Sequence, residues 1–544
     1  MLETISRHFI RGLLAVFTTV VLLLLQSAFW SGAVSVWMRI AVVIVASIAY
    51  FRPQKGLLLL AAIVPLGQVG SRTLNSDMRG AEALALAFLA GALVRGWTLR
   101  EFRSFPSTRV ETAAVVFGLI VAASCAEQLW LLQVQTSQAW PFVQSVLTYA
   151  SHHYLASYRE FDTIFSAMLL LEGMALLAYT LKYARQSPAF AHRIVVALII
   201  GAVIPTVFTV HQVMSELFDA NDLRTAITEI LLGLRWGPHI GDRNAAGSFF
   251  AMGLFIAFGM ALTNPRYRIL WATGGCALAL TTIMTGSRTA IAAVMLVTIC
   301  LAAAATIGRV IGVLKAGAIA AAVSAASAVA LWHYLPREYF GHGATLAMDV
   351  RRLFLHTTWR MLTSNPLFGV GVGQYASSSA HYSAPELLNY YVSENAHNNF
   401  AQIAGEVGAV GAAAFMAVLV CALWYRGGRR DSNHATTLPL IAGITAFIVS
   451  WLGGHPLLVP EVAYPFWIAL GVAAAALAPD PVPNGPAGVI IMAVCGVLIV
   501  SIPYRVASKE HLANTVSSVH EHPARRFAER QLLKEDRPSV RKFH

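Results

Sequence analysis

Apolar runs of about the length of a membrane span recur along most of this chain. The first extends from Leu13 to Phe29, and similar runs follow as far as residue 503. Because a helix needs about 20 apolar residues to cross the hydrocarbon core of a bilayer, such runs predict membrane-spanning helices. Hydrophobic residues make up 57% of the 544 residues and charged residues only 12%, whereas soluble proteins carry about 25% charged residues. The sequence therefore predicts an all-α, polytopic helical membrane protein without a large soluble enzyme domain.

The boundaries of the apolar runs predict about 12 to 15 transmembrane helices. One of these runs, at 56–69, is short and ends in glycines, so it is expected to be either a half-span or a full crossing. The organisation that we expect has four parts: N-terminal transmembrane helices at 1–240, a core at 241–425 that includes a large loop at 333–396, C-terminal transmembrane helices at 426–504, and a polar basic tail at 505–544.

Lys and Arg residues collect in alternate short loops. Because cytoplasmic loops carry an excess of these residues, the loops that hold them are expected inside the cell. They include Arg52, Lys55, Arg95, Arg100, Arg103, Arg109, Lys182, Arg185, Arg193, Arg266, Arg268, Arg309, Lys315, Arg426, Arg429 and Arg430. The loop at 333–396 then faces outward. A literal span count leaves the tail at 505–544 outside, but because of its basic charge we expect it in the cytoplasm.

Neither the charge nor the cysteines indicate a further class of function. The formal net charge is +12, but in a membrane protein such an excess serves topology, so membrane lipid and not nucleic acid is the expected surrounding partner. All five cysteines lie in apolar stretches without the paired spacing of a zinc site or a disulfide framework. They are interpreted as packing residues.

His397 lies where the large outer loop returns to the membrane, within Glu394-Asn395-Ala396-His397-Asn398-Asn399-Phe400. A neutral imidazole has a pKa near 6.5 and can take a proton from a hydroxyl nucleophile. Gln402 and Glu406 follow at helical spacing, so they are expected on or near the same face as His397. The sequence therefore indicates a candidate general base at the membrane surface.

Several arginines are expected on the outer face, where the topology rule predicts none. Arg288 lies in a break between two apolar runs, Arg243 precedes another, and Arg351 and Arg352 lie in the large loop. Guanidinium groups bind phosphates bidentately and stabilise charge on a leaving group. As a set, these residues predict an anion site for a diphosphate. Residues 349–364, which end near Arg360, fit a helix lying on the outer membrane surface.

Other motifs of cofactor and metal chemistry are missing from the sequence. Glycines 369, 371 and 373 lack the strand and the spacing of a dinucleotide site, so they are interpreted as positions where the backbone turns sharply or approaches a ligand. The chain has no Asp-x-Asp, His-Glu-x-x-His or phosphate-binding loop motif. We therefore expect metal-independent chemistry with no cofactor.

Four features follow one another in the second half of the chain: Gly286-Ser287-Arg288, a large loop with arginines, Asn-Pro-Leu-Phe-Gly-Val-Gly at 365–371, and Ala-His-Asn-Asn-Phe at 396–400 leading into Gln402 and Glu406. Their order and spacing resemble the O-antigen ligase and Wzy polymerase superfamily of bacterial inner-membrane glycosyltransferases. The resemblance covers about residues 240–415. The N-terminal half is similar only in being hydrophobic.

The resemblance implies a multi-pass protein whose active site faces the periplasm. It implies an undecaprenyl-diphosphate-linked glycan as donor, with His397 as the base that activates the acceptor hydroxyl. Arg288 and Arg352, with Arg351 as the alternative to Arg352, would hold the diphosphate. The residues expected to contact substrate are Arg243, Arg351, Arg360, Asn398 and Glu406.

The acceptor and the exact reaction stay open at this point. The lipid A core of lipopolysaccharide, a growing glycan or a protein would each suit these motifs, as a ligase, a Wzy-type polymerase or a protein O-oligosaccharyltransferase. A transporter of lipid-linked glycan is the alternative from another class, and it predicts inverted repeats and charges at the membrane midplane. The sequence instead concentrates its charges at the outer rim. A structural subunit of an envelope assembly is the third hypothesis.

Overall fold

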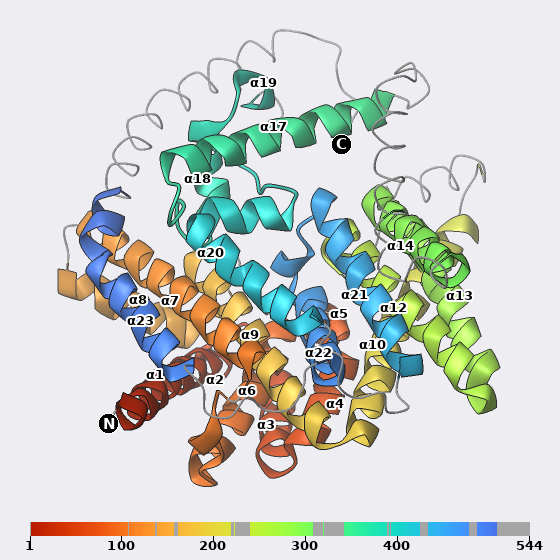
Figure 1. Ribbon diagram of the computed structural model, residues 1–544, viewed down its shortest axis with the longest axis horizontal. Coiled ribbons are helices and arrows are strands. Elements are labelled where there is room, and N and C mark those ends of the chain that lie inside the picture. The colour runs from red at the N-terminus through yellow and green to blue at the C-terminus, as the bar shows by residue number, and fades with distance from the viewer. Residues whose placement is uncertain are drawn as a thin grey trace.

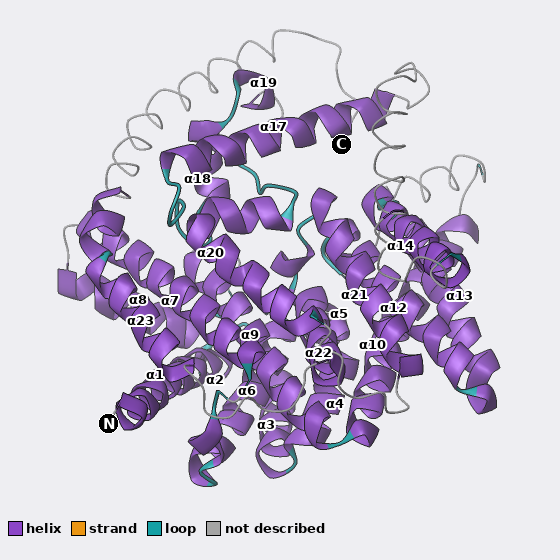
Figure 2. Ribbon diagram, in the orientation of Figure 1, coloured by secondary structure: helices purple, strands orange, loops and turns teal. Residues whose placement is uncertain are grey.

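The protein is helical throughout the part that the structure describes (Figure 2). This computed structural model describes residues 2–106, 108–135, 139–156, 162–218, 222, 240–307, 319, 342–388, 391, 393–424, 434–477 and 487–508. Every regular element in these ranges is a helix, and none is a strand. The prediction of an all-α polytopic membrane protein is therefore confirmed.

The helices follow the apolar runs of the sequence. Those of the first half are α1 (Leu2–Leu25), α2 (Ser27–Trp30), α3 (Val36–Phe51), α4 (Pro53–Ile63), α5 (Gly67–Thr73), α6 (Gly80–Thr98), α7 (Arg109–Gln135), α8 (Ala139–His153), α9 (Asp162–Gln186) and α10 (Pro188–Phe218). Those of the second half are α12 (Arg243–Thr263), α13 (Arg268–Met284), α14 (Arg288–Thr306), α17 (His342–Ser364), α18 (Tyr375–Tyr382), α19 (Pro385–Leu388), α20 (Asn399–Leu423), α21 (His434–Ser450), α22 (Pro460–Leu477) and α23 (Ala487–Val500). Short 3-10 turns are η1 (Val64–Leu66), η2 (Glu101–Ser104), η3 (Pro265–Tyr267), η5 (Trp451–Gly453) and η6 (Pro456–Leu458).

Within the described residues, 10 helical segments are long and apolar enough to cross a membrane. The number is 11 if Ala487–Val500 and Ile502–Ser508, which meet at a 51° bend, form one span. Two shorter apolar helices, Val36–Phe51 and Thr437–Gly453, accompany them. The apolar run at 311–332, which also predicts a membrane span, lies outside the described residues, apart from residue 319. The chain is a multi-pass membrane protein.

The doubtful run at 56–69 belongs to a longer segment with a break. Helices α4 and α5 join through the 3-10 turn η1, which contains Pro65, and together they form a candidate span of 21 residues, Pro53–Thr73. Gly67 lies so close to Ala81 of α6 that a Cβ there would collide with its backbone. The run is therefore long enough for a full crossing.

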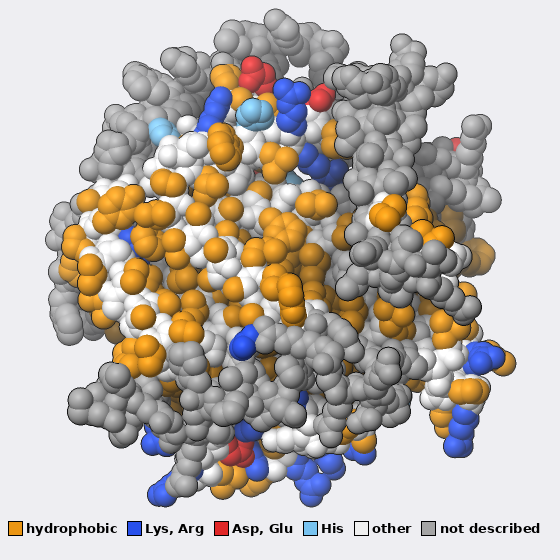
Figure 3. Space-filling view, in the orientation of Figure 1, with side chains coloured by type: hydrophobic (Ala, Val, Ile, Leu, Met, Phe, Trp, Pro, Cys, Tyr) orange, Lys and Arg blue, Asp and Glu red, His pale blue; other side chains and the backbone are white. Residues whose placement is uncertain are grey.

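Helix α22 forms the centre of the bundle, where it packs against α9, α20 and α21. Its aromatic residues Tyr464, Phe466 and Trp467 are fully buried. The outer surface carries a broad band of hydrophobic side chains, and the charged side chains lie toward the two ends (Figure 3). This distribution fits a bundle whose apolar belt faces lipid.

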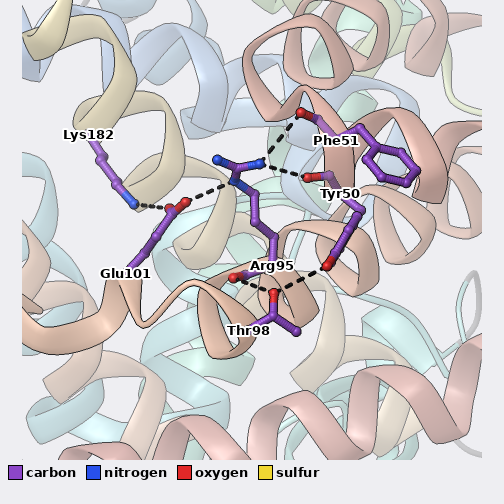
Figure 4. A network of polar contacts seen from close by, with 6 residues as sticks. All are labelled: Tyr50, Phe51, Arg95, Thr98, Glu101 and Lys182. Atoms are coloured by element: carbon purple, nitrogen blue, oxygen red, sulfur yellow. Dashed lines mark hydrogen bonds and ion pairs between the residues drawn. The ribbon is translucent and has the colours of Figure 1, made fainter.

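One end of the bundle is held by a network of basic residues (Figure 4). Arg95 at the end of α6 donates to the carbonyl of Tyr50 at 3.0 Å and to Glu101 at 2.8 Å. Lys182 of α9 contacts the other oxygen of Glu101 at 2.7 Å. Burial favours a higher pKa for Glu101, but Lys182 and Arg95 outweigh it and lower that pKa. Arg95 and Lys182, which were predicted to lie on the same face of the membrane, therefore meet at one end of the bundle.

At the other end, α17 lies across the top of the bundle, with α18 and the start of α20 below it and α19 above it in the view of Figure 1. The segment after α23 also reaches this end. Arg505 forms an ion pair with Glu127 of α7, and Ser508 donates to Asn365 at 2.8 Å. Residues 505–508 therefore lie at the same end of the bundle as Asn365 of the large loop, so the expectation that the tail begins on the opposite side was wrong.

A buried polar cluster lies inside the helical bundle. Arg79 contacts Glu82 of α6 at 3.1 Å and lies over the Tyr154 ring at 4.4 Å. Tyr154 donates to Glu82, and Tyr464 donates to Glu172 of α9. Both glutamates are completely buried. The expectation that charges concentrate at the outer rim was therefore incomplete, since these acidic groups lie within the apolar runs and are partnered there.

Candidate functional site

A break in α20 receives the glycine loop, which we define as residues 365–373. Gly408 has φ +67° and ψ −171°, so the helical hydrogen bonds across it are lost. Four backbone hydrogen bonds of 2.8–3.2 Å replace them: Ala409 N to Pro366 O, Val410 N to Leu367 O, Val370 N to Gly405 O, and Gly371 N to Glu406 O. The donors and acceptors that the break exposes are thus satisfied by the loop, as burial requires.

The glycines of this loop adopt backbone conformations that other residues rarely take. Gly369, Gly371 and Gly373 have φ values of +65°, +116° and +72°. A Cβ on Gly369 would collide with the backbone of Gly405 and Glu406, so the loop also needs a bare backbone to lie against α20. The prediction that these glycines allow sharp turns is confirmed.

Glu406 is buried and turns toward this loop. Gln402 donates to its carboxylate at 2.6 Å, and the backbone N–H groups of Gly373 and Tyr375 also donate to it. Gln402 in turn accepts from the Ala396 N–H at 2.9 Å. These contacts connect the glycine loop to the segment that carries His397. The expectation that Glu406 contacts substrate stays a prediction.

His397 precedes α20 and is not part of it. Its φ is +48°, and the next residue, Asn398, caps the helix by accepting from Ala401 N at 3.0 Å. Helical spacing therefore does not extend back to His397, and the expectation of one face shared with Gln402 and Glu406 was wrong. The imidazole instead lies among other rings, 5.1 Å from Phe354 of α17 between centroids.

Charged and titratable groups surround the half-buried imidazole. Its Nε2 lies 3.9 Å from Glu394, and its centroid is 4.9 Å from that of His455, in the turn between η5 and η6. Desolvation and the His455 charge lower the pKa of His397 to about 4, against the opposing effects of Glu394 and Asp242. The resting imidazole is thus neutral at physiological pH, as a general base must be.

Arg351 lies near this imidazole, and Arg288 lies near Arg351. Arg351 of α17 donates to the Gly453 carbonyl at 3.3 Å, and its charge acts on His397. Burial and the nearby Arg288 guanidinium lower the pKa of Arg351. Arg288 is the first residue of α14, after the Ser287 cap. Two positive charges held near one another suit a doubly charged anion.

The other predicted arginines differ in position. Arg352 is exposed, one position along α17 from Arg351, and about 100° around the helix. Arg360 is also exposed and donates to the Tyr382 carbonyl at 3.2 Å. Arg243 is exposed at the start of α12, next to Asp242. Arg351 is therefore the loop arginine that the structure places beside His397 and Arg288, while the binding roles of all four stay predictions.

Asp242 and His455 at this end of the bundle were not selected as candidate site residues from the sequence. Asp242 caps α12 by accepting from Ala245 N at 2.7 Å and acts electrostatically on His397 and His455. Asn244 and Gly454 are close enough that a glycine Cβ would lie 3.5 Å from the asparagine Cβ. The available signal was a polar residue in an outer break between apolar runs, the same signal that selected Arg288. The same signal, a polar residue in a break between apolar runs, is present at His455 and would have selected that residue too.

The described residues contain no group of three or more His, Cys, Asp or Glu that could hold a metal ion. Residues 273–416 match a family model described as O-antigen ligase. We refer to this matched segment as the O-antigen ligase domain. The resemblance to the O-antigen ligase and Wzy polymerase superfamily is thus confirmed over it. No curated protein matches the chain.

The O-antigen ligase domain contains Arg288, Arg351, the glycine loop and His397, whereas Asp242 and His455 lie outside it. In general terms, the domain indicates glycosyltransferase activity of the ligase or polymerase type, with a lipid-linked glycan and an acceptor as partners.

Proposed function

We propose that this protein transfers a glycan from undecaprenyl diphosphate to an acceptor hydroxyl, at the periplasmic face of a bacterial inner membrane. The observation that carries the proposal is the convergence of His397, Arg288 and Arg351 at the end of the bundle covered by α17. These residues come from three separate helices or their ends, within one O-antigen ligase domain.

His397 is the general base of this reaction. Its imidazole is partly exposed, 28% by side-chain area, so an acceptor hydroxyl can reach it. Its low pKa keeps it free of a proton at neutral pH. As the hydroxyl oxygen attacks, its O–H bond breaks and the proton passes to the imidazole.

Arg288 and Arg351 bind the diphosphate of the donor. The acceptor oxygen forms a bond with the anomeric carbon of the sugar, while the bond from that carbon to the phosphate oxygen breaks. The electron pair of that bond leaves with undecaprenyl diphosphate, whose charge the two guanidinium groups stabilise. The protein itself supplies this positive charge, so the proposed reaction is metal-independent.

Arg351 rather than Arg352 is the loop arginine of this proposal. Arg351 is half-buried beside the Gly453 carbonyl, and Arg352 is exposed at the neighbouring position of α17. Guanidinium interactions with phosphate strengthen where water is excluded. Arg243, Arg360 and Asn398 remain as proposed contacts for parts of the substrate farther from the diphosphate.

The experiment that tests this function is glycan profiling of a deletion strain by gel electrophoresis and mass spectrometry. The strain is complemented with wild type, with His397→Ala, and with His356→Ala as control, since His356 is an exposed histidine of α17. We expect wild type and His356→Ala to restore transfer and His397→Ala to leave lipid-linked glycan untransferred. Complementation by His397→Ala at the wild-type level would refute the assignment.

The length of the accumulated glycan distinguishes the members of this reaction class. Full-length glycan on the lipid in the deletion strain identifies a ligase, and single repeat units identify a polymerase. Loss of glycan from proteins, with lipopolysaccharide unchanged, identifies a protein O-oligosaccharyltransferase.

A further inference from the structure

His455 lies beside the candidate base but outside the O-antigen ligase domain at 273–416. It occupies the turn between η5 and η6, and its ring centroid lies 4.9 Å from that of His397. Its Nδ1 is buried and has no hydrogen-bond partner among the described residues. Buried polar atoms are normally paired, so this nitrogen is not explained by a structural hydrogen bond.

The charges that face the two imidazoles come from four separate parts of the chain. Asp242 approaches from the start of α12 and Glu394 from the segment before α20, and both favour the protonated forms of both histidines. Arg351 of α17 opposes protonation of His397, as does His455 from its own turn. Burial lowers the pKa of His455 as well. The start of α12, which carries Asp242, lies against the turn of His455, since a Cβ on Gly454 would lie 3.5 Å from the Cβ of Asn244.

We propose that His455 and Asp242 are positioning residues that set the proton affinity of His397. Once acid solution has protonated His455, its charge opposes a proton on His397, and Asp242 stabilises the cation that forms when His397 takes the acceptor's proton. This inference rests on the proposed function, in which that proton passes to His397. After transfer the imidazolium returns the proton to solvent, and no other group is changed.

The opposing charges of the two residues lead to opposite effects. Without His455, no second imidazolium opposes protonation of His397 in acid solution, so protonation becomes easier and the acid limb of the rate profile moves to higher pH. Without the Asp242 charge the cation loses an attractive neighbour, so the limb moves to lower pH and transfer slows. A merely structural contribution would lower the rate without moving the limb in either direction.

The test uses full-length purified protein added to membranes of the deletion strain, which supply donor and acceptor. Initial rates of glycan transfer are measured between about pH 2.5 and 8, a range that extends below each expected limb, for wild type, His455→Gln and Asp242→Asn. Asparagine retains the helix cap and removes only the charge. We expect limb shifts of about one pH unit, upward for His455→Gln and downward for Asp242→Asn, and a rate loss of about tenfold for Asp242→Asn at pH 7, as one pKa unit corresponds to a factor of ten.

Limbs that stay at the wild-type pH in both variants overturn this inference, whether or not the rates fall. If Asp242→Asn does not fold, Asp242→Ser provides the same test because serine also caps. His397→Ala is measured in parallel. Full activity of that variant refutes the proposed function itself, whereas an inactive His397→Ala with unmoved limbs in the other two refutes only the contribution of His455 and Asp242.

Discussion

Replacing Gly369 with alanine should separate the glycine loop from α20. Gly369 has φ +65°, and its Cα faces the backbone of Gly405 and Glu406, where a Cβ has no room. That backbone is held by the hydrogen bonds from Val370 and Gly371, so it cannot yield as a flexible side chain would. The substitution therefore strains the loop and also breaks its contact with the helix.

The magnitude follows from two separate costs. A left-handed conformation costs a non-glycine residue about 1–2 kcal/mol, and overpacking a filled site costs about 1–3 kcal/mol. Together they predict a loss of about 2–5 kcal/mol for Gly369→Ala. Gly496 of α23 provides the matched control, because a Cβ there meets nothing within 4 Å. Alanine should stabilise that helical position by about 0.5–1 kcal/mol.

The assay is the apparent melting temperature of purified protein in detergent, together with hydrogen exchange of the Val370 and Gly371 amides. We expect Gly369→Ala to melt at least about 3 °C lower and both amides to exchange faster. Gly496→Ala should melt at or slightly above the wild-type temperature. A Gly369→Ala protein that equals wild type in melting temperature and in amide protection would refute the docking that we describe for α20.

Three further predictions concern charge. Arg351→Met should lower the rate of glycan transfer by about 10²- to 10³-fold, the cost of removing one group that stabilises transition-state charge. Arg352→Met should change that rate little. A larger loss for Arg352→Met than for Arg351→Met in a transfer assay would return the role to Arg352. Because the pKa of His397 is lowered to about 4, its contribution to the free energy of unfolding is present above pH 6.5 and is lost as the pH falls toward 4. For the same reason, protonation of His397 should change the transfer rate little between pH 6 and 8. An acid limb of the rate profile centred near 6.5 would contradict the assignment of His397 as the base. Arg79→Ala should cost about 3–5 kcal/mol in a melting assay, because it leaves Glu82 buried without its counter-charge, and adding Glu82→Gln should recover part of that loss.

The candidate site was only partly predictable from sequence. His397 and Arg288 were found because each is a polar residue at the outer end of an apolar run, which is a local signal. The choice between Arg351 and Arg352 was not local. Neighbouring helical residues point about 100° apart, so the orientation of α17 on the bundle decides which of them faces His397.

His455 and Asp242 show the same limit. Both occupy outer breaks between apolar runs, but they are more than 200 residues apart in sequence, and only packing of α12 against α21 and α22 brings them together. The break in α20 is similar. Its glycine was visible in the sequence, whereas the partner that satisfies its backbone was a loop about 40 residues earlier.

The sequence by itself determined that this chain is a helical membrane protein. Runs of about 20 apolar residues are long enough to cross a bilayer. In lipid the backbone N–H and C=O groups of such a run must form hydrogen bonds within the run, and a helix provides them. It also determined which glycines could adopt positive φ, since that property belongs to the residue. The tertiary structure alone decided which distant polar groups meet: the contacts of Arg79 and Glu82 with Tyr154, the ion pair of Arg505 with Glu127, and the position of His455 beside His397. Apolar length is a local property, but electrostatic partners depend on how distant helices pack.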